Sequence, residues 1–132
     1  MSAGNRKVKR PLSPFLQVFF HSPMTSWMSI THRLTGVALA FGILYFMWWM
    51  IAAAAGPEAY EFFMWFNGTP IGIFMLMGWS FCFYYHLANG IRHLFWDTGA
   101  LLDLRMAFTA GFAVIAFTAV VTAGTWFCIF FW

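Results

Sequence analysis

Three long apolar runs, separated by short polar stretches, dominate the hydrophobic pattern of this chain. The runs cover about residues 27–55, 70–96 and 106–132. Each is long enough for a helix to cross a hydrocarbon core about 30 Å thick, which takes about 20 residues. Gly56-Pro57 ends the first run, and residues 58–67 are expected to form a short loop with two acids. The pattern therefore predicts an all-α membrane protein with three transmembrane helices.

The composition agrees with a membrane protein and excludes an ordinary soluble domain. Of the 132 residues, 62% are apolar and only 8% are charged, whereas a soluble domain has about 25% charged residues. The chain is too short to enclose a transport pathway by itself. We expect one small helical domain, residues 27–132, whose polar groups inside the membrane need other subunits to bury them.

The basic residues predict the orientation, because the cytoplasmic flanks of membrane helices are enriched in Lys and Arg. With three spans and the amino terminus on the cytoplasmic or matrix side, the outer loop carries only Glu58 and Glu61. All basic residues then lie on the inner side or at its membrane edge: Arg6, Lys7, Lys9, Arg10, Arg33, Arg92 and Arg105. Residues 1–26 are predicted to be a basic segment that contacts partner subunits or the membrane surface. This placement of the charges argues against nucleic-acid binding.

The remaining composition narrows the chemistry and the compartment. Cys82 and Cys128 lie far apart in apolar segments and are expected to be packing residues. The sequence has no Cys-x-x-Cys-His motif, which excludes covalent attachment of a c-type haem. No transit peptide is evident, which favours a bacterial cytoplasmic membrane over the mitochondrial inner membrane, although a processed mitochondrial chain would look the same.

Ionisable side chains gather where the second run ends, between His86 and Asp97. Such a residue inside a membrane is costly, and its default interpretation is a functional site with a partner. His86 lies seven residues before His93, or roughly 10 Å along a helix, so both project from nearly the same face. We expect five side chains to meet at one depth near the inner face, with His86 deeper: His32, Arg33, Arg92, His93 and Asp97.

His86 allows two interpretations. It could be a packing histidine that is satisfied by a neighbouring hydroxyl or carbonyl. Alternatively it could be the axial ligand of a b-type haem, which needs a neutral imidazole nitrogen and a flat apolar pocket. Gly90, four residues on, would leave room for the macrocycle, and His93 and Arg92 could meet the haem propionates. Because the chain has no second histidine at matching depth, the haem interpretation predicts that a partner subunit supplies the other ligand.

Ser29, His32, Arg33 and Gly36 are spaced to lie along one face of the first helix. One interpretation is an arginine that reaches to the lipid headgroups beside a packing stripe of small residues. The other is a quinone headgroup site, because a hydroxyl and a guanidinium can bond the carbonyl oxygens of a quinone in an apolar pocket. For Asp97, simple charge pairing with Arg92 or Arg105 is favoured over a role in proton transfer.

Three segments together resemble the larger, cytochrome b-type membrane anchor subunit of succinate dehydrogenase, respiratory complex II. They are Arg10-Pro-Leu-Ser-Pro14, Ser29-Ile-Thr-His-Arg-Leu-Thr-Gly36, and the segment from His86 through Gly90-Ile-Arg-His93 to Trp96-Asp97. The likeness covers nearly the whole chain in order. One departure is Phe15, where the family often has a histidine after Ser-Pro.

The resemblance implies a haem b held between this subunit and a second small anchor, with His86 as the metal ligand. It implies that His32, Arg33 and His93 lie around the haem propionates, and that Ser29 and Arg33 bind ubiquinone beside the iron–sulfur subunit. Succinate would be oxidised on a flavoprotein subunit, so this chain carries no catalytic residue. Its expected role is to anchor the complex in the lipid, ligate haem and form half of a quinone pocket.

Two alternatives stay open. The first is a haem-free or menaquinone-linked anchor of a fumarate reductase-type complex, although loss of haem would leave His86 without a purpose. The second is a small transport subunit that relays protons through the buried His and Arg. That alternative expects polar residues through the outer half of the membrane, yet the first run is almost wholly apolar beyond Gly36.

Overall fold

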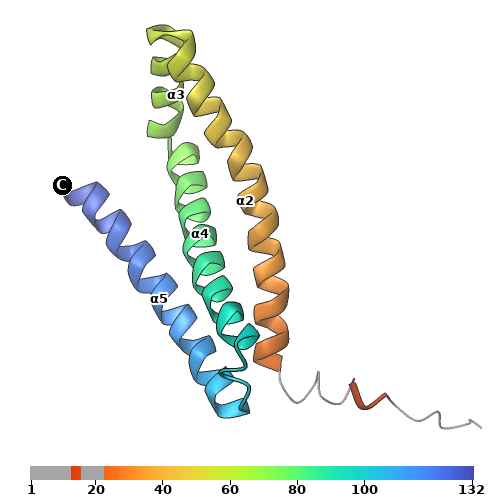
Figure 1. Ribbon diagram of the computed structural model, residues 1–132. Coiled ribbons are helices and arrows are strands. Elements are labelled where there is room, and N and C mark those ends of the chain that lie inside the picture. Colours follow the sequence, from red (N-terminus) through yellow and green to blue (C-terminus); the bar gives the residue numbers. More distant parts are fainter. Residues whose placement is uncertain (1–12, 16–22) are drawn as a thin grey trace, which may run out of the picture.

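The computed structural model describes residues 13–15 and 23–132, and most of the predicted basic segment, residues 1–26, lies outside the described residues. The described part contains four helices and no strand (Figure 1). The helices are α2 (Pro23–Ala55), α3 (Pro57–Gly68), α4 (Pro70–Asp97) and α5 (Leu104–Phe131). The helices α2, α4 and α5 are long and apolar enough to span a membrane, over Met24–Ala55, Pro70–Asp97 and Leu104–Phe131. The prediction of an all-α protein with three membrane helices is confirmed.

The expectation of a short loop at residues 58–67 is wrong, because these residues belong to α3. Gly56 makes the turn with φ 118°, and Pro57 occupies the first helical turn, where its missing N–H is not needed. Phe63 is buried, with its ring 4.8 Å from the ring of Trp48 in α2. The segment is helical because it has an apolar side to place against the end of α2.

The other helix starts also follow from local chemistry. The Thr69 hydroxyl accepts a hydrogen bond from the Gly72 backbone N–H at 3.1 Å, which caps the beginning of α4 just before Pro70. Between α4 and α5 the chain turns through two residues with positive φ, Gly99 (φ 81°) and Leu101 (φ 61°). The Trp96 indole N–H holds this turn by donating to the Leu101 carbonyl at 3.1 Å.

Helix α4 lies between α2 and α5 and contacts both of them (Figure 1). A small core joins the three helices, formed by the buried side chains of Met28, Tyr85 and Val114. The Tyr85 hydroxyl lies 2.6 Å from the Thr31 hydroxyl of α2. In the most apolar 18-residue stretch of each span, only 11% of the residues are buried within the chain. Most of the helical surface is therefore left for lipid or other subunits.

The antiparallel arrangement places the beginning of α2, the end of α4 and the beginning of α5 at one end of the molecule (Figure 1). Arg33, Arg92 and Arg105 belong to these three ends, whereas Glu58 and Glu61 belong to α3 at the opposite end. The arginines of the described residues therefore gather at one end of the molecule, as the sequence indicates. That the basic end faces the cytoplasm or matrix stays a prediction.

Candidate functional site

Three imidazole rings meet between α2 and α4. The rings of His32 and His86 are stacked, with centroids 3.9 Å apart and planes only 9° from parallel. The ring of His93 lies 5.1 Å from that of His32 at an angle of 56°. His32 therefore lies between the other two histidines, and contacts His86 directly rather than only sharing the shallower depth that we predicted for it.

The Nδ1 atom of His86 is held by groups on α2. It lies 3.1 Å from the His32 carbonyl oxygen and 3.2 Å from the Thr35 hydroxyl. A carbonyl oxygen can only accept a hydrogen bond, so Nδ1 carries the proton and a neutral ring has its lone pair on Nε2. Among the described residues, none is recorded as a hydrogen-bond partner of Nε2. The ring is thus oriented in the way that metal-ligating histidines usually are.

Gly36 makes the close approach of His86 possible. A Cβ atom at Gly36 would lie 3.0 Å from Cε1 of the His86 ring, which is tighter than almost all real Cβ contacts. The predicted role of Gly36 in packing is thus specific, since it makes room for an imidazole. Gly90, by contrast, has nothing within 4 Å of the position of a Cβ, so the space beside it is open.

Ser29 and Arg33, the predicted quinone ligands, lie four residues apart near the beginning of α2. Ser29 is half-buried and Arg33 is exposed. Both belong to the end of α2 that carries the histidine cluster. Their predicted roles need a group from outside this chain, and the exposed guanidinium is free to approach one.

The expectation that Arg92 points toward the haem propionates together with His93 is wrong. Arg92 is only 3% exposed, and its guanidinium donates to the Ala107 carbonyl of α5 at 3.0 Å and to the Asn89 side-chain oxygen at 3.3 Å. It also lies over the ring of Trp96, 4.1 Å from the centroid. Arg92 is offset from His93 by one residue, about 100° around the helix, and so it faces α5 instead of the histidines.

Asp97 does not pair with Arg92, since the guanidinium is turned into the α4–α5 contact. The carboxylate lies at the last residue of α4 and is exposed, and Arg105 at the start of α5 is exposed as well. Neither side chain contributes to the histidine cluster in this structure.

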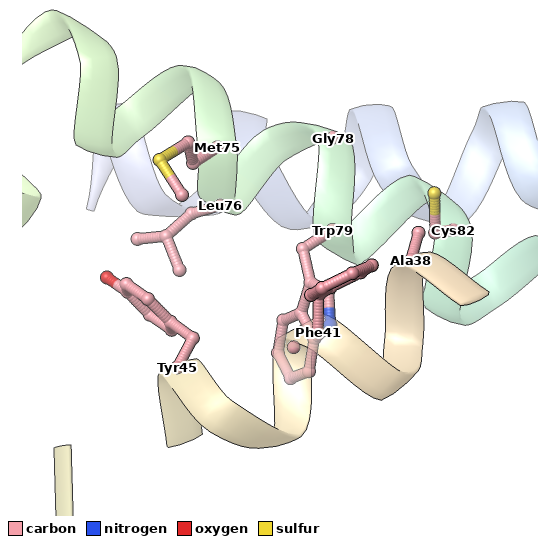
Figure 2. Close-up of a pocket in the computed structure, with 9 residues that line it drawn as sticks. Ala38, Phe41, Tyr45, Met75, Leu76, Gly78, Trp79 and Cys82 are labelled. Carbon is pink, nitrogen blue, oxygen red and sulfur yellow. The ribbon is translucent and has the colours of Figure 1, made fainter. Parts of the chain in front are cut away.

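An apolar cavity of about 350 Å³ lies between α2 and α4, on the side of the cluster away from the basic end. Figure 2 shows Trp79 reaching from α4 toward α2, with Phe41 and Tyr45 on the other wall. The indole nitrogen of Trp79 contacts the backbone at Gly42, where a side chain would collide with it. Cys82, one helical turn before His86, also lines the cavity, so the apolar space and the histidine share one face of α4.

The contact of Thr35 with His86 was not predicted from the sequence. Thr35 is 8% exposed, and its hydroxyl lies against the His86 ring as well as against its own helix. Its spacing from His32 of three residues placed it on the same helical face and was the available signal. Sequence alone could not show that this face meets His86.

A sequence model of the succinate dehydrogenase/fumarate reductase transmembrane subunit matches residues 6–125. The chain is 39% identical over 116 residues to a succinate dehydrogenase cytochrome b556 subunit of Paracoccus denitrificans, covering 88% of each chain. It is 36% identical over 118 residues to the corresponding subunit of Rickettsia felis, covering 89% of this chain and 91% of that one. It is also 34% identical over 126 residues to the mitochondrial cytochrome b560 subunit of Bos taurus, covering 91% and 72%.

These matches confirm the resemblance to the membrane anchor of succinate dehydrogenase. Three candidate spans and close bacterial relatives make this a multi-pass protein of a bacterial inner membrane. The family match extends over nearly all of the described residues, including the histidine cluster. The chain belongs to the family of succinate dehydrogenase/fumarate reductase transmembrane subunits, as a membrane-anchoring cytochrome b subunit.

Proposed function

We propose that this chain ligates haem b through Nε2 of His86 and forms part of the ubiquinone-reduction site of a succinate:quinone oxidoreductase. The observation that carries the proposal is the contact of His86 Nδ1 with the His32 carbonyl at 3.1 Å. This contact uses Nδ1 and leaves the lone pair of Nε2 free to ligate a metal. The relatives are named cytochrome b556 subunits, which agrees with a haem ligand in this position.

The surroundings of His86 fit a haem group. The open space beside Gly90, four residues after His86, and the apolar cavity that reaches Cys82, four residues before it, support room for a macrocycle in apolar surroundings. When bound, haem b supplies a one-electron redox centre. The propionates would be held at the basic end by His32, Arg33 and His93. His32 and His93 already lie together with His86, and Arg33 is exposed at the same end of α2.

A second anchor subunit would supply the other axial ligand. Two imidazoles that ligate one iron lie on opposite sides of the macrocycle. The His32 ring cannot take that role as it stands, because it is stacked on His86 at 3.9 Å and leaves no room for a macrocycle between the rings. The exposed apolar surface of the three spans is available for a partner helix. We therefore place the haem between this chain and a second small anchor.

The quinone would bind at Ser29 and Arg33, beside the iron–sulfur subunit that delivers electrons from the flavoprotein subunit. Ser29 offers a hydroxyl that can donate to a quinone carbonyl, and Arg33 offers a charged donor at the membrane edge. The half-buried position of Ser29 next to the exposed Arg33 suits a pocket completed by another subunit.

Removal of the imidazole tests the haem proposal most directly. In a reduced-minus-oxidised optical spectrum of the purified complex, the His86→Ala variant is expected to lose or strongly shift the b-type α-band while the subunits still co-purify. An unchanged band would make His86 a packing histidine and would refute the proposal. A wild-type complex without any band would favour the haem-free anchor of a fumarate reductase-type complex.

The quinone proposal is tested by separating two activities of the complex. For Ser29→Ala and Arg33→Leu we expect succinate-dependent quinone reduction to fall about tenfold or more, as for a lost hydrogen bond to a polar ligand. Reduction of an artificial acceptor that takes electrons before the membrane subunits should be unchanged. Arg105→Leu, which removes another exposed arginine at the same end, is the matched control. Equal losses in Arg105→Leu and Arg33→Leu would contradict a specific site.

A further inference from the structure

Thr35 lies in a hydrogen-bonded arrangement that links α2 to the His86 ring. The Thr35 hydroxyl is 2.9 Å from the His32 carbonyl oxygen and 3.2 Å from His86 Nδ1. The same carbonyl is 3.1 Å from Nδ1, so the three groups form a closed triangle. With Thr35 only 8% exposed, water has little access to this triangle.

The donors and acceptors of the triangle can be assigned completely. The carbonyl oxygen of His32 accepts, so the Thr35 hydroxyl must donate its proton to it. The lone pairs of the Thr35 oxygen then face Nδ1–H of His86, which is shared between the hydroxyl and the carbonyl. Rotation of the imidazole by a half turn would place Cδ2–H against two acceptors and lose both bonds. The triangle therefore fixes the orientation of the ring as well as its tautomer.

An ordinary helical threonine does not explain this contact. Threonines often donate to a carbonyl three or four residues earlier in their own helix, and Thr118 of α5 does so to the Val114 carbonyl at 2.8 Å. Thr118 is buried more deeply than Thr35, at 1% exposure, but its hydroxyl is recorded with no partner on another helix among the described residues. The second contact of Thr35, across to a histidine of α4, is what distinguishes it.

We propose that Thr35 is a positioning residue for the axial ligand: with the His32 carbonyl it holds His86 so that Nε2 faces the haem, and it tunes the basicity of the ligand. The inference rests on the proposed haem function. A hydrogen bond from Nδ1–H to an acceptor increases electron density on a ligating imidazole, and such outer partners typically change metal affinity by about 10–100-fold when they are removed. Loss of the hydroxyl is expected to lower the affinity for haem and to raise the reduction potential of the haem.

The test uses the assembled complex and compares variants of Thr35 that lack the hydroxyl with one that keeps it. Thr35→Val removes the hydroxyl and keeps the shape, and Thr35→Ser keeps the hydroxyl. Should the valine variant fail to assemble, Thr35→Ala and Thr35→Ser differ from each other only by the hydroxyl and give the same comparison. Thr118→Val is the matched control, because it removes a buried threonine hydroxyl from α5. The measurements are the midpoint potential of the b-type band by redox titration and the rate of haem loss to a haem scavenger.

We expect the variants without the hydroxyl to lose haem about tenfold faster and to titrate at a higher potential than wild type. Thr35→Ser and Thr118→Val should behave as wild type. Equal potentials and loss rates in all variants would overturn the positioning role, and so would equal changes in Thr35→Val and Thr118→Val. His86→Ala in the same series separates the two proposals. If its band is lost while Thr35→Val equals wild type, only the positioning role fails; if its band remains, the haem proposal itself fails.

Discussion

Helix α4 carries two buried or half-buried ionisable residues, His86 and Arg92, on different faces, and their hydrogen bonding differs. On the face toward α2, His86 is anchored through one nitrogen, with the apolar cavity at Cys82 on one side of it along the helix and open space at Gly90 on the other. On the face toward α5, Arg92 is 3% exposed and bonded to the Asn89 side chain and the Ala107 carbonyl. Both residues are costly inside a membrane, and each keeps one nitrogen without a recorded partner among the described residues. That nitrogen is Nε2 of His86, whose lone pair can ligate a metal, whereas Nε of Arg92 carries an N–H that can only donate.

The comparison teaches how to separate a functional polar residue from a structural one in a membrane helix. The two terminal nitrogens of Arg92 donate within the chain, to groups on α4 and α5 and to the Met28 sulfur of α2. The charge of Arg92 lies over the Trp96 ring. His86 hydrogen-bonds to the neighbouring helix α2 through Nδ1 alone. We therefore expect substitution of Arg92 to lower the stability of the fold. Substitutions around His86 should alter haem binding and leave the stability of the fold unchanged.

The largest effect should come from Arg92→Ala. Truncating a buried side chain of this size, with loss of its bond to α5, should destabilise the α4–α5 pair by about 2–5 kcal/mol. The midpoint of thermal denaturation of the solubilised complex, together with the yield of assembled complex, measures this. The complex that does assemble should keep its b-type band, since the guanidinium does not face the histidines.

Arg105→Ala provides the matched control for Arg92→Ala, because Arg105 is an exposed arginine of the neighbouring helix. Its effect should stay within about 0.5 kcal/mol, as is usual for surface substitutions. The distinction between the two faces would be broken if Arg92→Ala proved as stable as wild type, or if it lost haem without losing stability.

A smaller and more selective effect is expected for Gly36→Ala. The added methyl group would lie 3.0 Å from Cε1 of His86, so the ring must shift and its Nδ1 contacts must weaken. Haem retention should fall about tenfold, as for a lost outer partner of a ligand. Helix stability should not fall, because alanine is favoured over glycine inside a helix by about 1 kcal/mol. The rate of haem loss and the thermal midpoint, measured on one sample, give both values.

Gly124→Ala in α5 separates the two parts of this prediction. A Cβ at Gly124 meets nothing within 4 Å, so only the gain in helix propensity remains. We expect unchanged haem retention and equal or slightly higher stability. Equal haem loss in Gly36→Ala and Gly124→Ala would show that the open space at Gly36 is not what admits the His86 ring.

The sequence allowed the spans to be predicted because each is a long apolar run with a clear end, such as Gly56-Pro57. The predicted starts and ends differ from the structure by at most three residues, for example 27–55 against Met24–Ala55. Helix α3 was missed since two glutamates and a short length resembled a loop. Its aromatic residues Phe62, Phe63 and Phe66 recur at helical spacing and were the signal for an apolar side.

The site could be predicted only as far as helical spacing reaches. His86, Gly90 and His93 share a face by their spacing, and the structure places the two histidines together with His32. Arg92 was misplaced because charge suggested a role in anion binding, whereas its offset of one residue from His93 turns it away from the histidines and toward the Ala107 carbonyl of α5. Contacts between helices, such as that of Thr35 with His86, depend on helix rotation, which a single sequence does not specify.

The smallest effect should come from the Tyr84–Thr125 hydroxyl pair, which joins α4 and α5 farther from the basic end than Arg92 does. The Tyr84 and Thr125 hydroxyl oxygens are 3.0 Å apart, and Thr125 donates to the Val121 carbonyl, so Tyr84 is the donor. Tyr84→Phe should lower stability by only about 0.6 kcal/mol, as for an average hydrogen bond between membrane helices. A double-mutant cycle with Thr125→Val in thermal denaturation measures the pair. A coupling as large as the loss in Arg92→Ala would show that the α4–α5 contact is held along its length and not mainly by Arg92.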